Sequence, residues 1–359
     1  MTLVNICTEF NIDKKQIVSL QPYGSGHIHD TYRVETSENV NYILQKINRG
    51  IFADVPLMQK NIEKIIDHLM KRRSISQQVP EMLLAKDGLS YFQDEDEEYW
   101  RMFVFIKGTK TYDCVSSPEI AYEAGSAFGN FQRLLQDFDP AFLADTLPRF
   151  HDISYRLELF DNAIQNDLAK RVSEIPGEID FIRSRIGRMT RVLNLGQKGR
   201  IPLRVTHNDT KINNVLFDEH DKAVCVIDLD TVMSGYIHYD FGDAIRTGAA
   251  SAEEDERDLE KMFIDMELFE AYSRGFLSYV HDLLNETEKK TLAFAPQLMT
   301  FIIGLRFLTD YINGDIYFKV KKADHNLIRW KAQKKLLLSM EEHEDEMCDI
   351  IKSIEKESD

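Results

Sequence analysis

The chain of 359 residues has few cysteines, and its 44 Lys and Arg are outnumbered by 60 Asp and Glu. Its four cysteines are scattered, with no C-x-x-C pair and no histidine at metal-ligand spacing, so a disulfide framework is not expected and a reduced, cytoplasmic setting is favoured. The formal net charge of −16 argues against a nucleic-acid partner, because phosphate backbones are bound by clustered Lys and Arg. This charge does not argue against a nucleotide bound in a locally basic cleft.

Long hydrophobic runs are also lacking. The N-terminus has no basic segment followed by a long apolar core, and the apolar stretch near 298–305 is much too short to span a bilayer. We therefore expect no secretion signal, no transmembrane segment and no membrane partner. Internal repeats and low-complexity linkers are not seen either, and the length favours two or three domains.

Hydrophobic periodicity divides the chain into a strand-rich part and a helical part. Strands are expected at 17–23, 31–35, 41–47, 89–92 and 99–106. One amphipathic helix is expected at 56–71, and beyond Ser117 helices are expected at about 152–168, 178–195, 253–281, 290–313 and 324–355. The sequence thus predicts an α+β fold, with a small antiparallel-sheet N-lobe at 1–107 and a larger, mainly helical C-lobe at 108–359.

The strongest functional signal lies between Thr206 and Asp230. His207 and Asp209 form an H-x-D motif, and Asn214 follows five residues after the aspartate. In phosphoryl transfer, a carboxylate such as Asp209 orients the acceptor hydroxyl and takes its proton. Lys211, two residues further on, adds a positive charge near the transferred group, so both residues are predicted to be catalytic.

A metal site is predicted beside this motif. The apolar run 223–227 ends on Asp228, and Mg²⁺ between phosphates needs hard oxygen ligands such as those of Asn214 and Asp228. Taken alone, an H-x-D occurs by chance, and a strand that ends in Asp-Leu-Asp is usually a turn with capping carboxylates. The combination of spacing, the strand 215–217 and the turn 218–222 favours the catalytic interpretation.

Two regions of the N-lobe are candidates for holding a nucleotide. Gly24, Ser25, Gly26 and His27 lie between two strands, where a glycine-rich turn brings backbone amides close to phosphates, although an ordinary hairpin turn would look the same. Kinases of this plan also use a lysine on the third strand, paired with a helix glutamate.

The third strand leaves that lysine ambiguous. Gln45 and Lys46 are neighbours and so point to opposite faces, and motif register favours the uncharged Gln45. Lys46 is retained as a candidate cation, and Glu63 on the helix 56–71 is its candidate partner.

Four residues are predicted to line the acceptor side. They are Asp243, Arg306, Asp315 and Tyr317, which offer directed donors and acceptors beside an aromatic wall. Asp243 and Arg246 could instead pair with each other on one helix turn, and Arg306 could form an intrahelical ion pair with Asp310. We assign Asp240 a structural role, in which its carboxylate accepts backbone amides of the catalytic loop.

Longer blocks of sequence identify a family. The chain resembles the aminoglycoside phosphotransferase and choline kinase-like superfamily, and within it the N-acetylhexosamine 1-kinases. The blocks that carry the resemblance are PYGSGHIHDTY at 22–32, YILQKIN at 42–48, EAGSAFGNFQ at 123–132, IPLRVTHNDTKINNVL at 201–216, VIDLDTVMSGYIHYDFGDAIR at 226–246 and GLRFLTDYINGDIYF at 304–318.

The resemblance implies a bilobal protein-kinase-like fold that uses ATP and Mg²⁺. It also implies phosphorylation of the anomeric hydroxyl of N-acetylglucosamine or N-acetylgalactosamine, with the sugar and ATP as small-molecule partners. It matches Asp209 to the catalytic base, Asn214 and Asp228 to the metal ligands, and 24–27 to the phosphate loop. Gln45 departs from the superfamily, which often has a basic residue there.

Two rival functions remain open from the sequence. One is a kinase for another alcohol, such as homoserine, choline or an aminoglycoside; a cationic substrate would want a cage of carboxylates and aromatic rings. The other is a nucleotide-binding pseudokinase, which Gln45 favours and which Asp209, Asn214 and Asp228 oppose. The sequence assigns no oligomeric state.

Overall fold

An antiparallel sheet forms the N-terminal part of the protein. Our computed structural model describes residues 1–24, 28–74 and 77–358. The strands run in the order β1-β2-β3-β6-β4, with β5 paired to β6. Their bounds are β1 (Ile17–Pro22), β2 (Asp30–Thr36), β3 (Asn41–Lys46), β4 (Met82–Leu83), β5 (Phe92–Gln93) and β6 (Tyr99–Val104).

Two helices cover the two faces of this sheet, α1 (Leu3–Glu9) and α2 (Val55–Arg72). Leu44 and Met102 pack in the cluster that includes α1, whereas Phe103 packs against the cluster that includes α2. Successive strand residues point to opposite faces. Gln45 of β3 and Arg101 of β6 are register partners and therefore lie on the α2 face.

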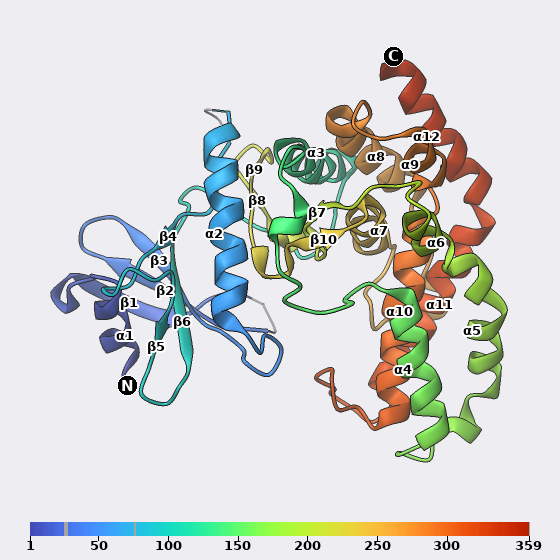
Figure 1. The fold of residues 1–359 in the computed structure, drawn as a ribbon, viewed down its shortest axis with the longest axis horizontal. Coiled ribbons are helices and arrows are strands. Elements are labelled where there is room, and N and C mark those ends of the chain that lie inside the picture. The colour runs from blue at the N-terminus through green and yellow to red at the C-terminus, as the bar shows by residue number, and fades with distance from the viewer. Residues whose placement is uncertain (25–27, 75–76, 359) are drawn as a thin grey trace.

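The local sequence explains where α2 begins and ends. The carboxylate of Asp54 accepts a hydrogen bond from the backbone N–H of Leu57 at 3.0 Å, and Pro56 occupies the first turn, where no backbone donor is needed. Lys71 and Arg72 lie in the last turn, where the helix dipole favours positive charge. This helix is the element of the N-terminal part that faces the helical part of the molecule (Figure 1).

The remainder of the chain is mainly helical, with two small two-stranded sheets set among the helices (Figure 1). The helices are α3 (Pro118–Leu134), α4 (Ile153–Asn166), α5 (Pro176–Met189), α6 (Arg191–Gln197), α7 (Ile237–Gly248), α8 (Met266–Val280), α9 (Glu286–Leu292), α10 (Ala295–Asn313), α11 (His325–Glu342) and α12 (Glu344–Ser358). The small sheets pair β7 (Arg204–Thr206) with β10 (Met233–Gly235), and β8 (Val215–Phe217) with β9 (Ala223–Val226). The predicted α+β architecture is confirmed, while the domain boundary at 107–108 stays a prediction.

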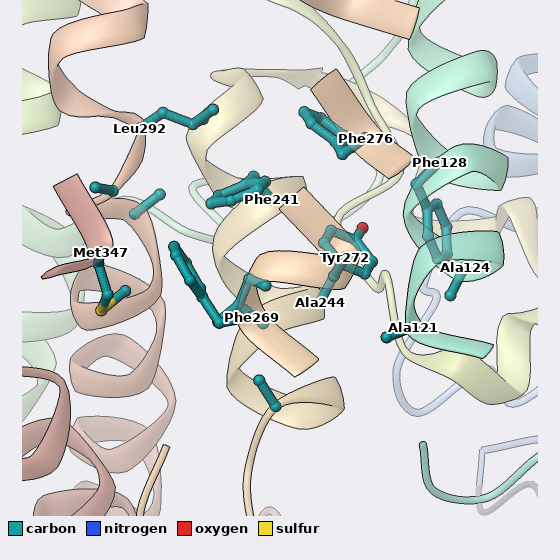
Figure 2. Packing of buried hydrophobic residues seen from close by; sticks show 14 of the residues in the cluster. Ala121, Ala124, Phe128, Phe241, Ala244, Phe269, Tyr272, Phe276, Leu292 and Met347 are labelled. Carbon is teal, nitrogen blue, oxygen red and sulfur yellow. The ribbon is translucent and has the colours of Figure 1, made fainter. Parts of the chain in front are cut away.

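The core of the helical part is built on close helix contacts. Figure 2 shows Phe241 of α7 facing the α8 residues Phe269, Tyr272 and Phe276, with ring centroids 5.3–6.3 Å apart. Helices α7 and α10 approach so closely that a Cβ atom on Gly242 would lie 2.4 Å from the carbonyl oxygen of Ala295. The two helices therefore form one packed unit.

Four of the expected helices differ from those in the structure. The segment 253–281 is helical only from Met266, because Asp265 caps that point by accepting hydrogen bonds from two backbone amides. The segment 178–195 breaks at Thr190, whose hydroxyl donates a hydrogen bond to the carbonyl oxygen of Ile186. The segment 290–313 breaks before Pro296, which has no backbone N–H to donate. The segment 324–355 breaks at His343, after which acidic residues open α12, where the helix dipole favours negative charge.

No single helix within the described residues is long and apolar enough to cross a bilayer. The pair α9 and α10 meets the length and composition test only when joined across a bend of 62°. Most residues of α10 are buried against other parts of the protein, as in a core helix.

Candidate active site

The H-x-D loop follows β7 and is fixed by a buried carboxylate on α7. Asp240 accepts hydrogen bonds from the backbone N–H groups of His207 and Asn208, each at 2.8 Å, and from the side chain of Gln132 at 2.7 Å. His207 is itself buried, and its Nε2 lies 3.0 Å from the carbonyl oxygen of Ile227. The predicted bracing role of Asp240 is confirmed, and the loop is a rigid support for Asp209.

Asp209, Lys211 and Asn214 are brought together by this loop. Lys211 Nζ lies 3.1 Å from Asp209 Oδ1, and Asn214 Nδ2 lies 3.2 Å from Asp209 Oδ2. Burial opposes ionisation of Asp209, but the charges of Lys211 and His207 and the bond from Asn214 outweigh it, so its pKa lies below the usual value. The neighbouring carboxylate in turn raises the pKa of Lys211. The loop thus holds an ionised carboxylate beside a cation.

Asp228 stands at the end of β9 in a left-handed backbone conformation, with φ 62° and ψ 62°. Such a conformation is uncommon for a residue other than glycine and is found at sites where the surroundings enforce it. Solvent reaches the side chain, yet packed protein around it and the charges of Asp230 and Asp209 raise the pKa of Asp228 to about 7. Crowded carboxylates of this kind attract a cation.

The donor set fits a magnesium ion shared with phosphates. Among the described residues, the amide oxygen of Asn214 and the carboxylate of Asp228 accept no hydrogen bond, so both are available as ligands. No cluster of three or more His, Cys, Asp or Glu side chains suited to a metal occurs in 1–24, 28–74 and 77–358. Mg²⁺ does not need one, because it usually keeps waters and substrate phosphates as its other ligands.

Asp230 is the centre of a buried network that sequence reasoning missed. Arg101 forms a two-pronged ion pair with it, with Nη2 2.9 Å from Oδ2, and His29 Nε2 lies 2.6 Å from Oδ2. Arg101 also donates to Gln45 Oε1 at 2.9 Å and to Gln59 Oε1 at 3.3 Å. The predicted strand register placed Gln45 on the cleft face, but nothing in the local sequence of β6 marks Arg101 as its partner.

The other nucleotide-side candidates lie apart from this network. Lys46 pairs with Glu98 at 3.0 Å on the sheet face opposite Gln45, so it lies away from the Arg101–Asp230 network. Glu63 is half-buried one turn beyond Gln59 on α2, and it is Gln59 that contacts Arg101. Gly24 has φ +83°, as a tight turn requires, whereas Ser25, Gly26 and His27 lie outside the described residues.

Arg306 and Tyr317, both predicted to line the acceptor side, contact each other. Arg306 Nη2 lies 3.3 Å from the Tyr317 hydroxyl, and its guanidinium lies over the rings of Phe150 and Phe318 at 5.0 and 5.5 Å. The residue after Phe150 reaches the catalytic loop, because His151 Nε2 lies 3.0 Å from the carbonyl oxygen of Asn208. The aromatic wall therefore adjoins the loop that carries the base. Phe150 and His151 had no signal in the sequence.

The two predicted acceptor-side carboxylates are both engaged in ion pairs. Asp315 lies 2.6 Å from Arg171 Nη1 and accepts a hydrogen bond from Asn326 at 2.8 Å. Asp243 lies 2.9 Å from Arg246, and both side chains are almost fully buried. Buried carboxylates need such partners. The structure thus favours the intrahelical pairing of Asp243 and gives Asp315 a place in the scaffold.

The chain is similar to a known protein family and to several solved structures. The protein-family model described as "Phosphotransferase enzyme family" matches residues 19–275. A solved microcompartment-associated aminopropanol kinase is similar, with 16% identity, a TM-score of 0.59, and coverage of 96% of this chain and 97% of that one. A choline kinase from Cryptosporidium parvum has 16% identity, a TM-score of 0.59 and 98% coverage of both chains.

A third solved structure is an aminoglycoside phosphotransferase from Alicyclobacillus acidocaldarius. It has 10% identity and a TM-score of 0.62, and the match covers 96% of this chain and 97% of that chain. Identities this low show a shared fold and leave the acceptor open. The family model spans both the sheet and the H-x-D loop with its metal-ligand candidates, and the chain therefore belongs to the phosphotransferase enzyme family.

Proposed function

We propose that this protein is an ATP- and Mg²⁺-dependent kinase that phosphorylates the anomeric hydroxyl of N-acetylhexosamines, N-acetylglucosamine or N-acetylgalactosamine, to give sugar 1-phosphates. Family membership supports phosphoryl transfer by this chain. The resemblance of the blocks at 201–216, 226–246 and 304–318 to N-acetylhexosamine 1-kinases supports the acceptor.

The observation that carries the choice of acceptor is the charge of the acceptor wall. The half-buried Arg306 places a positive charge on this wall, and Arg156 lies near enough that burial and the charge of Arg306 lower the pKa of Arg156 to about 10. The carboxylates Asp243 and Asp315 are neutralised by their own arginines. A cationic acceptor such as choline or an aminoglycoside would want free carboxylates together with aromatic rings, and here the rings already face the cation Arg306. A neutral sugar suits donors beside aromatic rings.

The chemistry follows from the base and its neighbours. Asp209 accepts a hydrogen bond from the sugar 1-hydroxyl and takes its proton, as the oxygen bonds to the γ-phosphorus and the bond to the β-phosphate oxygen breaks to release ADP. Lys211 offsets negative charge beside the transferred group. Asn214 and Asp228 would hold Mg²⁺, which neutralises phosphate charge when bound. An anomeric hydroxyl is more acidic than an ordinary alcohol, so the ionised Asp209 is a sufficient base.

A substrate panel tests the proposal directly. Purified protein with ATP and Mg²⁺ is offered N-acetylglucosamine, N-acetylgalactosamine, homoserine, choline and kanamycin, with ADP release as the readout. The phosphorylated product is then analysed by ³¹P NMR, since coupling to one anomeric proton distinguishes a 1-phosphate from a 6-phosphate. Turnover with choline or kanamycin and none with either sugar would overturn the proposed acceptor.

A substitution in the aromatic wall gives a second test of the proposed acceptor. Arg306→Met should raise the sugar KM by about 10- to 100-fold, the value of one charge-assisted hydrogen bond, and leave the ATP KM unchanged. Arg274→Met is the matched control, because Arg274 pairs with the surface carboxylates of Glu270 and Glu357 on α8 and α12. An unaltered sugar KM in the Arg306 variant would remove this residue from the acceptor site.

A further inference from the structure

A buried cation links the sheet to the metal-ligand loop. We propose that Arg101 on β6 takes the place of the lysine that β3 lacks, and that it acts as a positioning residue: by holding Asp230 it fixes the loop that presents Asp228 to the nucleotide-bound metal. This inference rests on the proposed kinase function and names how its metal site is held.

The contacts of Arg101 show that its charge is directed at Asp230. Arg101 is 1% exposed, and both terminal nitrogens of its guanidinium bond the two oxygens of Asp230. Its remaining donor, Nε, bonds Gln45 Oε1 at 2.9 Å, while Gln45 Nε2 lies 3.2 Å from the Thr31 hydroxyl. Gln45 therefore orients the guanidinium and carries no charge itself.

The charges in this cluster balance. His29 Nδ1 accepts a hydrogen bond from the backbone N–H of Asn48 at 3.0 Å, so the proton of a neutral His29 lies on Nε2 and points at Asp230. Asp230 is 3% exposed and receives donors from both Arg101 and His29. Without Arg101 the cluster would keep a buried carboxylate with no compensating cation, which is strongly unfavourable.

Asp230 controls the position of Asp228 because the two residues belong to one turn. The 3₁₀ helix η5 (Leu229–Thr231) starts directly after the left-handed Asp228, and Leu229 is buried in the core beside α2. Thr231 closes the turn by donating its hydroxyl hydrogen to the carbonyl oxygen of His207 at 2.6 Å. The turn is therefore held at two points. Arg101 of the sheet bonds Asp230, and His207 of the catalytic loop bonds Thr231.

The arrangement differs from the lysine–glutamate pair in what it connects. That pair joins a strand of the sheet to a helix of the same lobe. Here the glutamate position is taken by Gln59, a neutral acceptor 3.3 Å from Arg101, and the ionic partner is in the other part of the molecule. The consequence is that removal of Arg101 should impair metal-assisted nucleotide binding more than metal-free nucleotide binding.

Calorimetry with ADP tests this without an acceptor sugar. The Kd of wild type for ADP is measured with Mg²⁺ and with EDTA. The Kd in EDTA divided by the Kd in Mg²⁺ is the factor by which the metal strengthens ADP binding. Arg101→Gln should lower this ratio by about tenfold or more, a coupling of ordinary size, and change metal-free affinity by less than about threefold. Lys46→Gln is the matched control, since Lys46 pairs with Glu98 on the opposite sheet face.

Further variants keep the result decisive if Arg101→Gln is poorly folded. Arg101→Lys retains the charge but not the two-pronged geometry, so its ratio should fall between those of wild type and Arg101→Gln. The double variant Arg101→Gln/Asp230→Asn removes both charges, so it should recover thermal stability without recovering the metal benefit. A wild-type ratio in any folded Arg101 variant, or an equal loss of metal-free affinity, overturns the positioning role.

These outcomes are distinguishable from failure of the proposed function. If wild type binds ADP with a metal benefit that Arg101→Gln loses, yet phosphorylates no N-acetylhexosamine, the acceptor proposal fails and the role of Arg101 stands. If the sugars are phosphorylated and Arg101→Gln leaves the ratio of dissociation constants unchanged, the acceptor proposal stands and the positioning role of Arg101 fails. Absence of any ADP binding by wild type overturns both.

Discussion

The side-chain amide of Asn214 donates to Asp209 at two points, at 2.9 Å to the carbonyl oxygen and at 3.2 Å to Oδ2. This pair of contacts holds the carboxylate of the predicted base and leaves the amide oxygen of Asn214 without a hydrogen bond among the described residues. One residue therefore orients the predicted proton acceptor and also carries a predicted metal-ligand atom. The base and the metal site cannot be displaced independently.

Replacing Asp209 by Asn should abolish proton acceptance and keep the size of the side chain. We expect kcat to fall by about 10²–10⁴-fold, the usual contribution of a positioned base, with the KM values for ATP and sugar little changed. Steady-state kinetics with N-acetylglucosamine measures both. Glu219→Gln, on an 85% exposed side chain of the turn between β8 and β9, is the control. Full turnover by Asp209→Asn would exclude Asp209 as the base.

Asp310 is predicted to control acceptor affinity through the loop that carries Tyr317. Its carboxylate accepts the backbone N–H groups of residues 316–318 at 2.8–3.0 Å and the side chain of Asn326 at 2.8 Å. Asp310→Asn replaces one acceptor oxygen with a donor, so unfolding free energy should fall by about 1–3 kcal/mol.

The kinetic readout separates this role from a general loss of stability. The sugar KM should rise in Asp310→Asn while the ATP KM stays constant, because only the loop beside Arg306 is loosened. Asp349→Asn, on a surface carboxylate paired with Lys352, is the matched control. A destabilised variant with an unaltered sugar KM would show that the loop does not position Tyr317 for the acceptor.

The crossing of α3 and α8 should be intolerant of a single methyl group. A Cβ atom on Gly275 would lie 2.0 Å from the carbonyl oxygen of Tyr122, so Gly275→Ala forces the helices apart. We expect it to lower the free energy of unfolding by about 1–3 kcal/mol. Gly187→Ala, in α5 where a Cβ meets open space, should instead raise it by about 0.5–1 kcal/mol. Urea unfolding measures the free energy of unfolding of both variants. Equal changes in this free energy would contradict the close contact of α3 and α8 at Gly275.

His238 should make the protein lose stability in mild acid. Burial lowers the pKa of His238 from 6.5 to about 3, and its Nε2 lies 2.8 Å from the Thr291 hydroxyl. The unfolded chain therefore binds the extra proton below pH 6.5 while the folded chain does not, so stability falls as pH decreases from 6.5 towards 3.

The variant His238→Gln removes this titration. Between pH 6 and pH 4, its plot of unfolding free energy against pH should be shallower than that of wild type by up to about 1.4 kcal/mol per pH unit. Urea unfolding at a series of pH values measures the slope. His220→Gln, on a side chain that is 78% exposed, should keep the wild-type slope. Equal slopes in wild type and His238→Gln would contradict a neutral buried histidine.

The sequence predicted those features that depend on residues close together in the chain. The H-x-D spacing and the strands 215–217 and 223–226 lie within one short segment, so local pattern sufficed to bring Asp209 and Asn214 together. Alternation along β3 predicted correctly that Gln45 and Lys46 face opposite sides. The bracing by Asp240 was predictable because only the short strand β10 separates helix α7 from the metal-ligand loop.

Features that depend on distant residues were beyond local pattern. Arg101 and Asp230 are 129 residues apart and meet only because the sheet packs onto the helical part. On α2, a shift of one helical turn separates the expected Glu63 from the observed Gln59, and periodicity does not distinguish two residues on the same face. Helix breaks at Thr190 and His343 depend on single residues within long helical patterns.

The close contact between α7 and α10 at Gly242 has a consequence for how this enzyme scaffold diversifies. Asp240 on α7 anchors the loop of the predicted base, and Arg306 on α10 is predicted to face the acceptor, so both are carried by one closely packed pair of helices. The segment 314–324 follows α10 directly and carries Tyr317, whose hydroxyl contacts Arg306. Engineering new acceptors should therefore begin with exchanges in this segment, which can reshape recognition without misaligning the chemistry.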